Sequence, residues 1–206
     1  MQKIISRDKF ISEELDDILS EEEKNLIQTT QGIDQKFYYI NIDKEIEEPS
    51  KYRLIFDVLR TAREQDIVTI IVNTPGGRGD TLSQLLYYVD SCKAHTICEL
   101  HQGYSAGAYF PFICDEVQLH HFSTMMFHEG SYVMYGKSNE HSDYAEYSKK
   151  EDERMLRKFC TGFLTVKEIE EIMKGKDLYL DSDEIQKRLD IMNSKKTPKK
   201  KGKVEK

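Results

Sequence analysis

The segment Gly103-Tyr104-Ser105-Ala106-Gly107 contains the residue that is best placed to act as a nucleophile. A strand is predicted before Ser105 and a helix rich in small residues after it, so the serine lies at a helix N-terminus. Free backbone N–H groups point outward there and the helix dipole favours negative charge. Small neighbours also allow close backbone approach, so an oxyanion can be held beside the serine. The alternative is that Ser105 only caps the helix, because G-x-S-x-G matches often arise by chance.

A second motif, Pro75-Gly76-Gly77, follows an apolar strand. Adjacent glycines tolerate positive φ angles and present their N–H groups without obstruction by side chains. Such a loop can bind an anion, but an ordinary strand-to-helix turn has the same composition. The motif gains weight only together with a nucleophile.

A general base for Ser105 is offered by His128, which ends the predicted strand 124–127. The end of a strand is a rigid position from which an imidazole can reach a serine hydroxyl. His120 and His121 are typical of surface residues, although either remains an alternative base. A lone histidine is more often structural, so this interpretation of His128 depends on the preceding nucleophile.

The elements that must position these residues alternate between strands and helices. Strands are predicted at about 37–42, 67–72, 96–101, 116–119 and 124–127, and helices at about 50–64, 81–91, 105–113, 142–160 and 166–174. The apolar run 67–72 is typical of a strand buried on both faces. The alternation predicts an α/β fold with a largely parallel sheet.

Length and composition indicate a single globular domain. The chain has 206 residues, of which 38% are hydrophobic and 33% charged. No apolar run reaches the roughly 18 residues of a membrane span, and residues 1–8 lack the apolar stretch of a secretory signal. We therefore predict a cytoplasmic protein without a membrane partner. The four cysteines have no zinc-ligand spacing, so we expect reduced, buried thiols, no metal and no cofactor.

Charge divides the chain into three parts. Residues 1–35 form an acidic N-terminal segment in which seven carboxylates lie between Glu13 and Glu23, and a short amphipathic helix is predicted there. Residues 36–192 carry the globular pattern, and 193–206 form a basic tail that we expect to be disordered. Seven lysines fall between Lys195 and Lys206, so the remainder is more acidic than the net charge of −7 indicates. An acidic body argues against binding to nucleic acid.

Four motifs, taken in order, resemble the proteolytic subunit of Clp protease, a serine peptidase within the wider crotonase-like fold. The matching segments are 71–77 with the Pro-Gly-Gly loop, 103–108 around the serine, 126–128 ending in the histidine, and 176–180 followed by Glu184. The resemblance spans about residues 37–190. Four motifs in the right order are far more specific than any one of them.

The resemblance implies a Ser-His-Asp triad and its oxyanion hole. Ser105 would be the nucleophile, His128 the base, and Asp177, rather than Asp181 or Asp183, the acid. The N–H groups of Gly77 and Ala106 would bind the oxyanion.

The resemblance also implies the fold and the partners. The fold would be a ClpP- and crotonase-like spiral of β-β-α units with a protruding handle helix, which 142–160 would supply. The activity would be that of a serine endopeptidase acting on peptides or unfolded proteins, without a metal or cofactor. Its active sites would face the chamber of a homo-oligomer of stacked rings, to which an AAA+ unfoldase could dock.

Some positions depart from the family pattern, and two alternatives stay open. Tyr104 replaces a small residue, Glu129-Gly130 replaces Gln-Pro, and the tyrosine-rich segment 131–147 replaces a glycine-rich strand. These departures fit a divergent, phage-encoded member. One alternative is an α/β-hydrolase esterase, although that fold needs a late histidine, and the last one here is His141. The other is a non-enzymatic scaffold subunit of the same fold.

Overall fold

The computed structural model describes residues 26–32, 34–133 and 135–195. The amphipathic helix expected within residues 1–35 falls mainly outside this range, and so does the disorder expected beyond residue 195. The described part nevertheless exceeds the predicted domain 36–192 at both ends. A strand precedes Lys36, and the last helix continues to Lys195.

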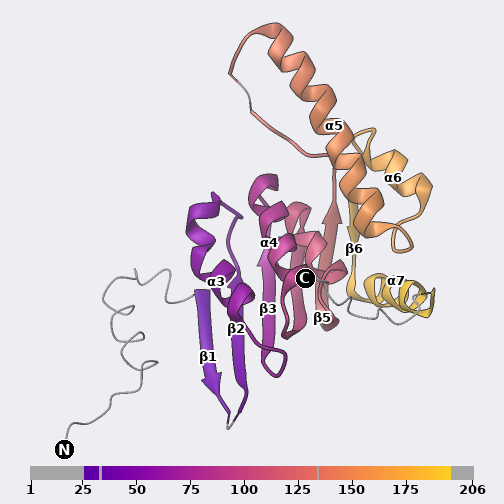
Figure 1. Cartoon of the computed structure of the whole chain (residues 1–206). Helices are drawn as coiled ribbons and strands as arrows, with labels where there is room; N and C mark the ends of the chain where they lie inside the picture. The colour runs from indigo at the N-terminus through magenta and orange to yellow at the C-terminus, as the bar shows by residue number, and fades with distance from the viewer. Residues whose placement is uncertain (1–25, 33, 134, 196–206) are drawn as a thin grey trace, which may run out of the picture.

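A mixed six-stranded sheet forms the centre of the molecule (Figure 1). The strands lie side by side in chain order: β1 (Ile27–Gln31), β2 (Lys36–Ile42), β3 (Ile67–Thr74), β4 (His95–Tyr104), β5 (Glu116–Phe127) and β6 (Leu178–Leu180). The pairs β2–β3, β3–β4 and β4–β5 are parallel, whereas the two edge strands pair antiparallel. The predicted α/β fold is confirmed, and its sheet is mixed, with parallel pairs in the centre and an antiparallel pair at each edge.

Helices connect the strands, as parallel pairing requires. They are α3 (Arg53–Thr61), preceded by the 3-10 turn η1 (Pro49–Tyr52), then α4 (Gly79–Ser91), the 3-10 helix η2 (Ser105–Phe112), α5 (Ser138–Cys160), α6 (Val166–Ile172) and α7 (Ser182–Lys195). The segment after Ser105 was predicted to be a helix rich in small residues. It is a 3-10 helix with Pro111 inside it, and proline cannot donate the hydrogen bond that an α-helix needs there.

One face of the sheet is covered more completely than the other. Val68, Ile70 and Val72 alternate along β3, are buried, and share one core with the apolar sides of α3 and α4. On the opposite face Ile71 and Glu99 are only half-buried. The expected burial of both faces of β3 is therefore met only in part, and the second face stays open to solvent at β4 and β5.

Three elements were not predicted, and two predicted strands are one. β1, β6 and α7 had no counterpart, and the strands predicted at 116–119 and 124–127 are the two halves of β5. The register of β5 against β4 jumps from Leu100↔Leu119 to Gln102↔Thr124. A bulge formed by residues 120–123 thus joins the two predicted strands into one.

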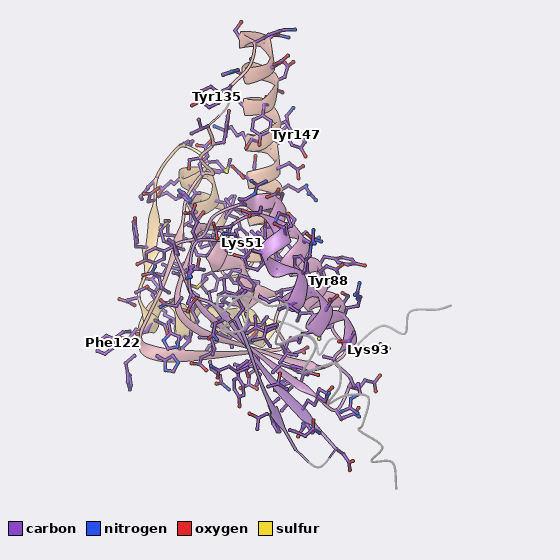
Figure 2. The ribbon with its side chains drawn as sticks, turned by 90° about the vertical axis from the view of Figure 1, so that its left-hand side faces the viewer. Lys51, Tyr88, Lys93, Phe122, Tyr135 and Tyr147 are labelled. Carbon is purple, nitrogen blue, oxygen red and sulfur yellow. The ribbon has the colours of Figure 1, made fainter. Side chains whose placement is uncertain are left out.

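The helix α5 projects beyond the sheet (Figure 1). Tyr147 lies on this projecting part and Tyr135 on the segment that leads to it (Figure 2). Both are exposed, Tyr135 by 93%. Within the described residues, no helix is long and apolar enough to cross a membrane. The four cysteines are free thiols, and three of them are buried, as expected.

Candidate active site

Ser105 occupies a strained turn between β4 and η2. Its φ angle is +52°, and among the described residues it is the only one other than glycine with a positive φ. Such a conformation costs about 1–3 kcal/mol and persists where the surrounding structure imposes it. The turn brings the chain abruptly from strand to helix and leaves the serine half-buried at the junction.

His128 meets this serine from the neighbouring strand. The parallel register of β4 and β5 pairs Tyr104 with Met126, so the next residues of both strands emerge at the same edge of the sheet. There His128 Nε2 lies 2.7 Å from Ser105 Oγ, within hydrogen-bond distance. Of the three candidate bases, His128 is the one that contacts the serine. His120 contacts Glu99 instead.

The Pro-Gly-Gly loop packs directly against the serine turn. Gly76 has a φ of +101°, and a Cβ atom on it would lie 2.6 Å from Ser105 Cβ and 3.0 Å from the backbone nitrogen of Ala106. Its N–H donates to Thr74 Oγ1 at 3.1 Å, and its carbonyl accepts from the Ile46 N–H at 2.7 Å. Only glycine fits this position, because both the backbone angle and the space exclude a side chain.

The N–H of Gly77 is available to a ligand. Ile46 bridges this loop by bonding to the Gly76 carbonyl and to the Arg78 N–H, and so bypasses Gly77. The Gly77 N–H has no acceptor among the described residues, and the residue is exposed. Ala106 lies in the first turn of η2, where N–H groups have no intrahelical acceptor. The two predicted oxyanion donors therefore flank the serine turn.

Asp177 precedes β6, the strand that pairs with β5, and it lies opposite His128 without contacting it. The antiparallel register of β5 and β6 pairs Phe127 with Leu178, so the next position of the same register sets His128 opposite Asp177. The Asp177 side chain is exposed, and within the described part of the chain it makes no hydrogen bond or ion pair. Its neighbour Asp181 has a structural role, because it accepts a hydrogen bond from the Glu184 N–H in the first turn of α7.

A second carboxylate near His128 was not predicted from the sequence. Asp152 of α5 is half-buried and accepts the Gly130 N–H at 3.0 Å. Burial raises the pKa of Asp152, while the Gly130 hydrogen bond and the charge of His128 lower that pKa in part. In the sequence Asp152 is one of many charges in a long helix, and nothing there distinguishes it.

No protein-family model matches the chain, and neither does any curated protein. The structure brings together a strained serine, an imidazole in hydrogen-bond contact with it, and backbone donors beside it. Such an arrangement can transfer a proton from the hydroxyl and stabilise a developing oxyanion.

Proposed function

We propose that this protein is a serine endopeptidase with Ser105 as its nucleophile. The observation that supports this best is the 2.7 Å hydrogen bond between Ser105 Oγ and His128 Nε2, formed where Ser105 alone among described non-glycine residues has a positive φ. A serine that merely capped a helix would need neither the strained backbone nor a histidine partner.

The proposed reaction follows the chemistry of acyl transfer. Ser105 Oγ attacks the carbonyl carbon of the peptide while its proton passes to His128 Nε2. The N–H groups of Gly77 and Ala106 hold the resulting oxyanion. His128 then gives the proton to the leaving amine, and a water molecule, deprotonated by the same imidazole, hydrolyses the acyl-enzyme.

Asp177 completes the proposed triad. The β5–β6 register, continued by one residue beyond the Phe127–Leu178 pair, sets His128 opposite Asp177, and the proposal is that the exposed carboxylate rotates toward Nδ1 of the imidazole. In that position it would fix the tautomer and stabilise the imidazolium. Because the Asp177 carboxylate does not contact His128 in this structure, the proposed activity would depend on contacts that hold the segment around β6 in place.

The substrates and the assembly are proposed from the resemblance to the Clp protease subunit and its spiral fold. Peptides and unfolded proteins would enter a chamber formed by stacked rings, with α5 as the handle that joins them, and an unfoldase could deliver longer chains. The exposed tyrosines on and before α5 support an interface there, because exposed aromatic clusters often mark contact surfaces. Light scattering coupled to gel filtration tests the assembly: an active species at 24.1 kDa would contradict the chamber.

Labelling with a fluorophosphonate tests the chemistry. We expect wild-type protein to be labelled at one serine and to cleave a short fluorogenic peptide, whereas Ser105→Ala loses both. Ser83→Ala is the matched control, because Ser83 is an exposed serine on α4 that bonds only to the Gly79 carbonyl. Unlabelled wild-type protein of correct fold would favour the scaffold subunit. Labelling with hydrolysis of esters but not of peptides would favour the esterase.

A further inference from the structure

Three side chains that play no part in the proposed peptidase chemistry converge on the open face of the sheet. Glu99 and His101 extend from β4, and His120 extends from β5. One ligand atom from each lies within 4.8 Å of the other two, and this is the one such group in the part of the chain that the structure describes. We refer to these three residues as the Glu99 cluster.

We propose that the Glu99 cluster binds a divalent transition-metal ion of the zinc class. The donor set of two imidazoles and one carboxylate is the set that proteins use for Zn²⁺ and its neighbours in the first transition row. The inference is independent of the Ser105 chemistry, because none of the three residues belongs to that site.

The distances fit such an ion. His101 Nε2 lies 3.0 Å and His120 Nε2 lies 3.4 Å from the same oxygen of Glu99, Oε1. In a tetrahedral site with bonds of about 2.0–2.1 Å, two ligand atoms are about 3.3 Å apart. The third separation, between ligand nitrogens of the two histidines, is within 4.8 Å, so the cluster needs side-chain adjustments of about 1.5 Å at most to enclose an ion.

The backbone prepares this convergence. Between Leu100 and Gln102 the register jumps, so β5 bulges opposite His101. Ser123 closes the bulge from inside: its hydroxyl donates to the Leu100 carbonyl at 2.6 Å and accepts the His120 N–H at 2.7 Å. Bulges commonly re-aim side chains at functional sites, and this one turns His120 to the same face as His101.

The two imidazoles are held together but remain accessible. Their rings stack with centroids 4.3 Å apart and an interplanar angle of 18°. The side chains of His101 and His120 are 41% and 48% exposed, and that of Glu99 is 28% exposed. Phe122, in the same bulge, is exposed and points away from the sheet (Figure 2). Water can therefore complete the coordination shell.

An ion at this site would link β4 to β5 across the bulge. Ser105 follows directly on β4 and His128 on β5, so the ion would clamp the two strands that deliver the proposed nucleophile and base. The expected consequence is a higher melting temperature with the metal than without it, since an ion that binds only the native state stabilises that state.

The test is titration of tag-free, full-length protein with Co²⁺ followed by its visible absorption, and with Zn²⁺ by calorimetry. We expect one ion per chain, and a loss of affinity of about tenfold or more in His101→Gln and in His120→Gln, since even residues behind the ligands contribute that much. His121→Gln is the control: this neighbouring side chain is exposed and outside the cluster, and its carbonyl keeps the Ser182 hydrogen bond.

Two results would overturn the proposal. One is the absence of saturable binding to the wild-type protein at millimolar metal. The other is binding that is unchanged in both His101→Gln and His120→Gln. Because both residues lie on the surface, circular dichroism should show folded variants. If either variant fails to fold, the imidazole resonances of His101 and His120 are followed in the wild-type protein. Shifts of both on addition of Zn²⁺ would support the proposal, and the absence of such shifts would overturn it.

Discussion

Replacing Gly76 by alanine should disable the proposed active site while leaving the fold in place. The added Cβ would lie 2.6 Å from Ser105 Cβ, 2.7 Å from the Tyr104 carbonyl oxygen and 3.0 Å from the Ala106 nitrogen. Two of these three atoms are backbone, which cannot rotate out of the way. The loop and the serine turn must therefore separate.

The size of the effect follows from these distances. Ordinary contact begins at 3.4 Å, so the serine turn must recede by about 0.8 Å relative to the loop. A misplacement of about 1 Å can lower a rate by roughly a hundredfold, and we expect a loss of that order in fluorophosphonate labelling and peptide cleavage. The φ of +101° adds about 1–3 kcal/mol of backbone strain, less than the stability of most domains.

Two other glycines serve as controls that separate the steric clash of an added Cβ from the backbone strain of a positive φ. At Gly175 the φ is +90° but nothing lies within 4 Å of an added Cβ, so Gly175→Ala should lose stability and keep its labelling rate. At Gly79, the first residue of α4, the space is equally open and no positive φ is involved. Gly79→Ala should therefore change neither property or slightly raise stability. If Gly76→Ala were labelled as fast as Gly175→Ala, the loop would not shape the site.

Two further predictions concern carboxylates. Asp177→Asn should lower peptide cleavage by roughly 10⁴-fold, the scale of triad acids, and Asp152→Asn by much less; the reverse order would assign the acid to α5. Arg63 holds the pKa of the buried Asp66 at about 2, below its ordinary 3.8. Because that pKa is lowered on folding, the contribution to unfolding free energy is complete above about pH 4 and lost as the pH falls toward 2. Asp66→Asn should cost about 2 kcal/mol of unfolding free energy at pH 7 and weaken the fall of that free energy between about pH 4 and pH 2. An unchanged pH dependence in urea titrations would refute the assignment.

The central strands and the residues at their ends could be predicted because their signals are local. The apolar run 67–72 forms β3, and the segments before Ser105 and His128 form β4 and the second half of β5. In parallel strands the carboxyl ends share one edge, so a serine and a histidine predicted at two such ends could be expected to meet. The 2.7 Å contact between them meets that expectation.

Other features depend on tertiary contacts that leave little trace in the sequence. The strand β6 has only three residues and exists through pairing with β5. The bulge at residues 120–123 interrupts the strand pattern of β5, so that one strand was predicted as two. The role of Ser123 is defined by its two hydrogen bonds, which the sequence does not show. In α7, by contrast, Ile185, Leu189 and Met192 have helical spacing and are buried, so that helix could have been predicted.

The strain at Ser105 requires a rigid support, and Thr74 at the end of β3 provides it. This side chain is fully buried. Its hydroxyl donates to the Lys44 carbonyl and accepts the Gly76 N–H, and its methyl group packs where a side chain on Gly107 would lie. One threonine thus fixes both the glycine loop and η2, the two segments on either side of the nucleophile.

Two substitutions separate the contributions of the Thr74 hydroxyl and the Thr74 methyl group. Thr74→Val keeps the methyl group but leaves the buried Gly76 N–H without its acceptor, which costs about 1–3 kcal/mol and frees the loop. Thr74→Ser keeps the hydroxyl and loses about 1 kcal/mol of apolar burial. Labelling rates measured well below both melting temperatures should therefore fall in the valine variant and be retained in the serine variant. Equal rates in the two would mean that Thr74 supports only the core, and the loop would then owe its position to the Ile46 bridge alone.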